Sequence, residues 1–381
     1  MYKIAILLAT SVSILFSTSC GQIISSVRQA AHQAERRPLP PRVRSAEIED
    51  VTVGSEPLRW TNNEFDAFEK TIRDMMKKRD FAGLDAMAAN FRQKKERFEK
   101  GGGWKIHSFY TVVSAPADDT EKGWIQQIKF LEDWKQASQK SIAARSALAN
   151  AYLGHAWKAR GSGYASEIPS DAVPVFESRL QKAVAEIREA STLEERCFGY
   201  FETLIRIGVG AGMNRTALDK VFDEAIAFDK TYPHFYIARA EYLLPRWYGE
   251  PGEMENFAES LTASLGENEG LKMYYLIVDK LGTYKWEGEF FAPGGLSWKR
   301  TKKGFTLYEK DHGISRYRLN QFARLTVTAR DSQAACNTFK RLQGENDFDP
   351  DVWSARQHFE EQRNMAINAM CKIPKFNNQA Q

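Results

Sequence analysis

The sequence predicts an all-α protein built from stacked antiparallel helix pairs. Apolar residues recur at helical spacing from Thr61 onward, and no segment keeps the strict alternation typical of a half-buried strand. The turns between the apolar stripes are short, which makes sequential helices antiparallel neighbours. Only the region 282–304, rich in glycine and lysine, is expected to be irregular.

The helical segments are identified by stripes of apolar residues three or four positions apart. Each stripe covers about one third of a helix surface and therefore needs a neighbouring helix to cover it. Thr61 or Asn62 is suited to cap the first helix. In chain order, the clearest stripes are Phe65, Phe68, Ile72 and Met76; Trp124, Ile128, Leu131 and Trp134; Phe176, Leu180, Ala183, Val184 and Ile187; Leu218, Val221, Phe222 and Ala225; and Met254, Phe257, Ala258, Leu261 and Leu265.

The N-terminus has the pattern of a secretion signal, assigned to residues 1–19. Lys3 precedes an apolar run from Ile4 to Phe16, and small residues follow before Cys20. The run of about 13 residues is shorter than the roughly 20 needed to cross a bilayer as a helix. We therefore expect export from the cytoplasm.

Cys20 resembles the lipid-accepting cysteine of bacterial lipoproteins, which becomes the first residue of the mature protein. The resemblance implies a membrane anchor through a lipid on Cys20. An aspartate at the next position would favour the inner membrane, so Gly21 favours the outer membrane. Ser17 and Ser19 also suit an ordinary signal peptidase, so a soluble periplasmic or secreted protein is the alternative.

The remaining chain is divided into a tether, one domain and a tail. Residues 20–57 contain few large apolar side chains and a Pro/Arg stretch, which predicts a disordered spacer. Residues 58–372 are expected to form a single helical domain, and 373–381 a disordered tail. In an exported protein we expect a disulfide between Cys336 and Cys371, with Cys197 as a buried thiol.

Charge and motif patterns point away from several function classes. The 53 basic residues are balanced by 49 acidic ones, and the basic runs lie beside acidic residues, so nucleic-acid binding is not expected. Gly208–Gly212 follows a helix instead of a strand, and Asp347–Asp351 lacks the glycine and glutamate of a calcium loop. The six histidines include no helical pair, and Ser162 lacks the residue order of a nucleophile elbow. No catalytic residue, metal site or cofactor is predicted.

Parts of the chain resemble known helical families. Residues 221–233, followed by 235–242, resemble a degenerate tetratricopeptide unit, in which Pro233 opens the next helix pair. Residues 151–165, 243–258 and 298–339 resemble the bacterial domain-of-unknown-function family 4034. That resemblance covers roughly residues 60 to 345 and implies a tetratricopeptide-like helical protein; it carries no catalytic residue over to this chain.

Two clusters contain more aromatic and charged residues than a turn requires, which makes them a candidate binding surface. The favoured interpretation is a scaffold that binds a protein or peptide of unspecified identity in the envelope. The alternatives are an enzyme with a polar pocket near His155, Arg160 and Glu253, and a purely structural envelope protein. The two clusters are His155, Trp157, Arg160 and Tyr164, and Arg246, Trp247, Tyr248 and Glu253.

Overall fold

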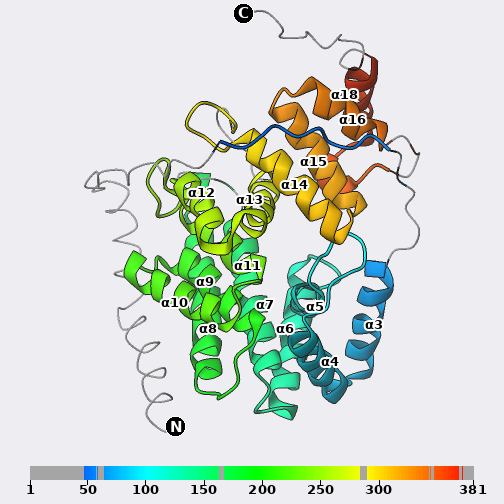
Figure 1. Cartoon of the computed structure of the whole chain (residues 1–381). Helices are drawn as coiled ribbons and strands as arrows, with labels where there is room; N and C mark the ends of the chain where they lie inside the picture. Colours follow the sequence, from blue (N-terminus) through cyan, green and yellow to red (C-terminus); the bar gives the residue numbers. More distant parts are fainter. Residues whose placement is uncertain are drawn as a thin grey trace, which may run out of the picture. The chain divides into compact units, whose positions relative to one another are not determined.

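The computed structural model describes residues 47–56, 58, 64–161, 163, 167–283, 290–342, 344, 347–368 and 371. Within these residues the regular structure consists of 16 α-helices, α3 to α18, and no β-strand, which confirms the all-α prediction (Figure 1). The signal segment, Cys20, Ser162, Tyr164 and the tail 373–381 lie outside the described residues. No helix of the described part is both long and apolar enough for a membrane span.

The folded chain divides into two compact units, where the sequence predicts one continuous domain. Unit 1 comprises the described residues within Asn63–Phe98 and Gly103–Pro251; unit 2 comprises those within Leu39–Asn62, Glu99–Gly102 and Gly252–Gln381. The short segment Glu99–Gly102 belongs to unit 2 through hydrogen bonds. The Gly101 amide donates to the His312 carbonyl at 3.0 Å, and the Tyr308 hydroxyl donates to the Gly101 carbonyl at 2.7 Å.

Unit 1 is organised around two largely buried helices, α7 and α9. Helix α7 packs along α8 and also contacts α6 and α9, while α10 and α11 cover α9. Side-chain caps fix several helix starts, as where the Ser141 hydroxyl accepts from the Ala144 amide. The helices are α3 (Glu64–Lys78), α4 (Phe81–Lys94), α5 (Lys105–Ser114), α6 (Glu121–Ala137), α7 (Ile142–Arg160), α8 (Ala172–Ser191), α9 (Phe198–Ala211), α10 (Arg215–Phe228) and α11 (Pro233–Tyr242).

Unit 2 is organised around α13, which packs between α12 and α14. A Cβ at Gly304 of α14 would lie 2.1 Å from the Leu271 carbonyl oxygen of α13, so this close helix contact requires glycine. The structure joins Cys336 of α16 to Cys371, with 5.2 Å between the Cα atoms. The helices are α12 (Glu253–Leu265), α13 (Glu267–Leu281), α14 (Trp298–His312), α15 (Arg316–Thr328), α16 (Ser332–Lys340), α17 (Pro350–Trp353) and α18 (Arg356–Asn368).

Two predicted boundaries need correction. The prediction of a disordered tether up to residue 57 is wrong for residues 47–56, which lie extended along unit 2 (Figure 1). Val53 is buried, its carbonyl accepts from the Asn337 amide at 2.9 Å, and Asp50 pairs with Lys302 at 2.7 Å. The region 282–304, expected to be irregular, is helical from Trp298 because Ser297 caps α14.

Candidate functional site

The structure brings parts of the two predicted clusters together in unit 1. Trp157 and Arg160 lie in the last turn of α7, and Arg246 and Trp247 lie in the turn that follows α11. The two indole rings meet nearly at right angles with their centroids 5.4 Å apart. All four side chains are partly exposed. We call these residues the tryptophan–arginine cluster.

The two arginines of the tryptophan–arginine cluster lie against its indole rings. The Arg160 guanidinium carbon is 5.3 Å from the Trp157 ring centroid and 5.2 Å from that of Trp247, so it contacts both rings. Arg246 contacts the Trp247 ring at 5.6 Å. Each distance lies within the range of a cation–π interaction. The result is a continuous aromatic and cationic surface built from two distant segments of the chain.

Local backbone geometry places Trp247. Its amide donates to the Leu244 carbonyl at 2.8 Å, which closes a tight turn. A Cβ at Gly249 would lie 1.8 Å from the Leu243 carbonyl oxygen, so only glycine fits there. Tyr248 anchors the same turn, since its hydroxyl donates to the Val209 carbonyl at 3.0 Å. Tyr248 therefore has a packing role, although it is partly exposed, as are Arg246 and Trp247.

The tryptophan–arginine cluster brings two positive charges close together. Burial lowers the pKa of Arg160, and the nearby charge of Arg246 lowers it further. Two like charges thus share one aromatic surface. Guanidinium groups stacked on aromatic rings are well suited to hold a carboxylate or phosphate by paired hydrogen bonds.

His155 has a separate role in packing. It is buried on α7, its Nε2 lies 3.0 Å from the Glu121 carboxylate, and its ring stacks on Trp124. Burial lowers the pKa of His155, although the hydrogen bond to Glu121 opposes this shift. Glu253 is the first residue of α12 and belongs to unit 2. The polar pocket expected from His155, Arg160 and Glu253 is therefore not formed within unit 1.

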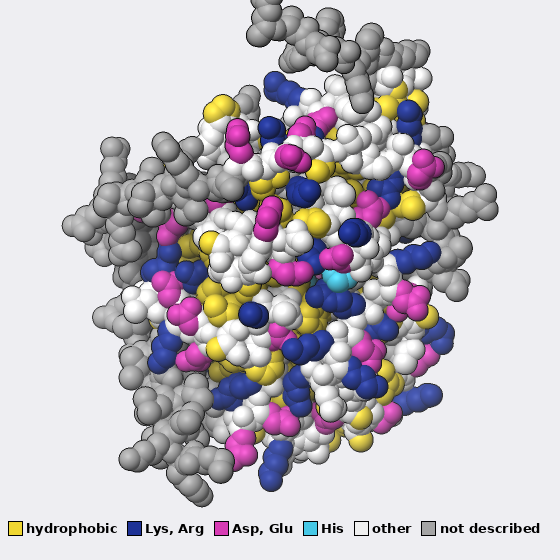
Figure 2. All heavy atoms as spheres, in the orientation of Figure 1, with side chains coloured by type: hydrophobic (Ala, Val, Ile, Leu, Met, Phe, Trp, Pro, Cys, Tyr) yellow, Lys and Arg dark blue, Asp and Glu magenta, His cyan; other side chains and the backbone are white. Residues whose placement is uncertain are grey.

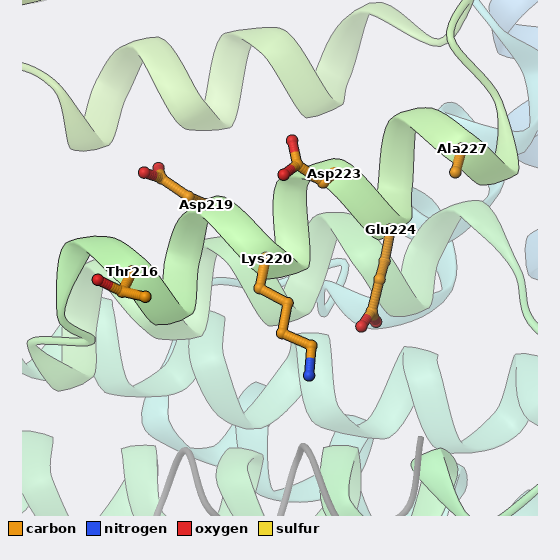
Figure 3. A pocket seen from close by; sticks show the side chains of 6 residues that line it. All are labelled: Thr216, Asp219, Lys220, Asp223, Glu224 and Ala227. Atoms are coloured by element: carbon orange, nitrogen blue, oxygen red, sulfur yellow. The ribbon is translucent and has the colours of Figure 1, made fainter. Parts of the chain in front are cut away.

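A surface pocket of about 590 Å³ lies along α10 (Figure 3). The residues that line it all belong to this one helix, with Asp219 and Asp223 on one side and Lys220 and Glu224 on the other. Asp219 is paired with Arg239 at 2.7 Å. Because no second element contributes a side chain to its lining, the pocket does not have the converging groups of an active site. It is best described as a solvated helix face.

Charges on the molecular surface are mixed. On the face shown in Figure 2, Lys and Arg side chains are interspersed with Asp and Glu, and apolar atoms show between them. Many charged side chains of the described residues form ion pairs, such as Arg79 with Asp133 at 2.8 Å. A surface of this kind is typical of solvated helices, whereas nucleic-acid binding proteins usually present an uncompensated basic face.

A cluster of His107, Glu202 and His234 was missed by the sequence analysis. These residues lie on α5, α9 and α11, and the donor atoms that they could offer to a metal ion all lie within 4.8 Å of one another. His107 Nδ1 is 3.1 Å from Glu202 Oε2, and the two imidazole rings are stacked with their centroids 3.4 Å apart. Burial would raise the pKa of Glu202, but the two histidines outweigh this effect and hold the pKa below its usual range.

One sequence signal could have directed attention to this cluster. Glu202 is the only acidic residue of the mostly apolar helix α9, whose one basic residue, Arg206, follows one turn later. A carboxylate in such a helix requires a polar or cationic partner, because an unpaired buried charge is very costly. Spacing along the chain cannot reveal the partners, since His107 and His234 lie on different helices.

Comparisons with family models, with curated proteins and with solved structures found no match to this chain.

Proposed function

We propose that this chain is an exported, lipid-anchored envelope protein whose helical body binds a protein or peptide through the tryptophan–arginine cluster. The observation that carries the proposal is the meeting of Trp157 and Arg160 with Arg246 and Trp247, from segments far apart in the sequence. Arg160 also serves the end of α7, since its Nη1 donates to the Gly161 and Gly163 carbonyls at 3.3 and 3.2 Å, but this geometry does not require the two tryptophans. Gly161 and Gly249 already provide what the backbone requires.

The residue types of the tryptophan–arginine cluster match those that dominate binding energy at protein interfaces. Tryptophan and arginine are enriched among interface hot spots because they combine a large apolar area with polar edges. The ligand that fits best is a peptide segment with a carboxylate beside an aromatic or aliphatic side chain. Its carboxylate would pair with Arg160 or Arg246, while its apolar side chain would pack on Trp247.

The experiment compares capture of envelope proteins by the parent and by variants of the tryptophan–arginine cluster. Trp247→Ala and Arg160→Met should lose the captured protein, because they remove the aromatic surface and the charge. Arg145→Gln is a matched control, since it also removes one arginine, paired here with Glu189 outside the cluster. Equal capture by the parent and both cluster variants would contradict the proposed binding role.

Thermal and urea unfolding of Trp247→Ala distinguishes binding from packing. A fully buried tryptophan should cost about 3 to 5 kcal/mol on truncation. Trp247 is partly exposed, and its loss removes one aromatic pair and its cation–π contacts, so we expect about 1 to 3 kcal/mol. A larger destabilisation, with capture unchanged, would make the tryptophan–arginine cluster a packing element.

The lipid anchor rests on the sequence, because Cys20 lies outside the described residues. A thiol directly after an apolar signal segment, followed by Gly21, supports an outer-membrane lipoprotein facing the periplasm. Intact-mass analysis of membrane-extracted protein should show a chain that begins at Cys20 with added acyl mass. Cys20→Ala should release the protein from membranes and leave its helical circular dichroism unchanged. An unmodified parent in the soluble periplasmic fraction would favour the ordinary secretion signal.

A further inference from the structure

We propose that His107, Glu202 and His234 form a binding site for one divalent transition-metal ion, with Zn²⁺ as the expected ion. Three helices of unit 1, α5, α9 and α11, bring these side chains together. The site uses no residue of the tryptophan–arginine cluster, so it is independent of the proposed binding function. Two imidazole nitrogens and one carboxylate oxygen are a donor set that suits zinc and related ions.

The distances within the cluster are close to those that a bound ion needs. Two donor atoms at 2.1 Å from one ion lie roughly 3.0 Å apart at a right angle and roughly 3.4 Å apart at the tetrahedral angle. His107 Nδ1 and Glu202 Oε2 are 3.1 Å apart and fit this range without movement. The remaining donor distances are at most 4.8 Å, so His234 must approach by roughly 1.5 Å at most. A change of side-chain rotamer and ring tilt supplies such a movement.

The stacking of the two imidazole rings indicates how a bound ion would change their orientation. Parallel imidazoles with centroids 3.4 Å apart hold their nitrogen lone pairs in two separate parallel planes, whereas an ion shared by both rings lies close to both ring planes. Binding should therefore tilt the rings of His107 and His234 relative to each other.

The surroundings of Glu202 resemble the supporting groups of known kinds of metal site. The Tyr232 hydroxyl donates to Glu202 Oε2 at 2.8 Å and so orients the carboxylate. Tyr232 is itself fully buried against the rings of Trp104, Phe198 and Phe235. A hydrogen bond to a ligating carboxylate, backed by an apolar wall, fixes the ligand and limits access of water.

Positive charges near the three ligands are expected to weaken the affinity for a metal ion. Arg206 lies one turn along α9, and its charge acts on Glu202. His107 and His234 lie in the first turns of α5 and α11, where the helix dipole also opposes a cation. Removing the Arg206 charge should therefore tighten metal binding, which a purely structural His–Glu contact would not predict. With three protein ligands, the ion would keep a position for water or an external ligand.

The test uses the full chain, purified through a tag without histidine, stripped with a chelator and titrated with Zn²⁺. The parent should bind one ion per chain, and Mg²⁺ should not compete, because magnesium prefers oxygen ligands. His234→Ala and Glu202→Gln should weaken zinc binding at least about tenfold, and Tyr232→Phe roughly 10- to 100-fold through the lost hydrogen bond. Arg206→Gln should bind zinc more tightly. His155→Gln removes a histidine that pairs with Glu121 elsewhere, and should leave zinc binding unchanged.

A second measurement on the parent avoids dependence on the folding of the variants. Zinc should protect His107 and His234 from modification by diethyl pyrocarbonate and leave the reactivity of His358 unchanged, as mapped by mass spectrometry. Absence of zinc binding by the parent would overturn the proposal. It would be overturned equally if zinc bound but both ligand variants kept the parent affinity, or if His107 and His234 reacted at the same rate with and without zinc.

Discussion

The disulfide between Cys336 and Cys371 offers a direct test of how unit 2 is stabilised. It connects α16 to the segment just after α18, and it closes a loop with a sequence separation of 35. In the chain-entropy description, a disulfide that closes a loop of this length lowers the entropy of the unfolded chain. This stabilises the folded state by about 4 kcal/mol. Cys336 is buried, so the bond also lies within the packed part of the unit.

The perturbation is the double variant Cys336→Ala with Cys371→Ala, compared with the parent in the presence and absence of a reductant. Alanine avoids a buried hydroxyl that would have no partner. We expect the free energy of unfolding of unit 2 to fall by about 4 kcal/mol, and its melting temperature by roughly 10 °C for a unit of this size. Urea unfolding followed by far-ultraviolet circular dichroism gives the first quantity, and calorimetry gives the second.

The division into two units sharpens the test. If the units unfold in separate transitions, only the one that belongs to unit 2 should move, because both cysteines belong to that unit. A change below about 1 kcal/mol in that transition would refute the loop argument. Recovery of both cysteines as free thiols from protein isolated from the envelope would refute the disulfide itself and weaken the proposal of export.

Further predictions concern buried charges of unit 2. Asp279→Asn should lower the free energy of unfolding, measured in urea, by about 3 to 5 kcal/mol. The reason is that the Arg318 guanidinium, which is bonded to Asp279 at 2.6 Å, would lose its carboxylate partner. A loss below about 1 kcal/mol would contradict this. Burial raises the pKa of Asp331, but hydrogen bonds from Lys302, the Ala334 amide and Trp298 outweigh burial and lower it. A depressed folded-state pKa gives stability that is present above the unfolded value of 3.8 and lost as the pH falls towards the folded-state value. Acid titration of stability should therefore be steeper for the parent than for Asp331→Asn, and equal slopes would show that Asp331 does not contribute.

The fold class was predictable because the sequence signals that define a helix lie close together along the chain. The stripe of Trp124, Ile128, Leu131 and Trp134 lies within α6, and these four side chains are buried as the period of 3.6 requires. Capping was equally local, as where the Asp331 carboxylate accepts from the Ala334 amide to start α16. Each of these signals lies within a few residues, so one sequence contains them in full.

The division into units and the role of residues 47–56 depend on contacts between distant residues. Val53 is one of three large apolar residues, with Ile48 and Val51, in an otherwise polar segment, and nothing near it in the sequence identifies Asn337 as the donor to its carbonyl. The same limit applies to Glu99–Gly102, whose partners His312 and Tyr308 follow about two hundred positions later. Composition describes how much apolar area a segment can bury, but it does not say where a short segment will lie.

The two candidate sites differ in how much of each could be predicted. Trp157 and Trp247 were each conspicuous in a turn, so their residue types were enough, and only their contact needed the structure. His107 and His234 were not conspicuous, because a search for metal ligands by spacing tests pairs on one helix and these two lie on different helices. The residue that connects them is Glu202, a largely buried carboxylate in a mostly apolar helix, whose charge requires compensation. A search that begins with buried acids and asks which cations reach them would therefore find sites that motif spacing does not.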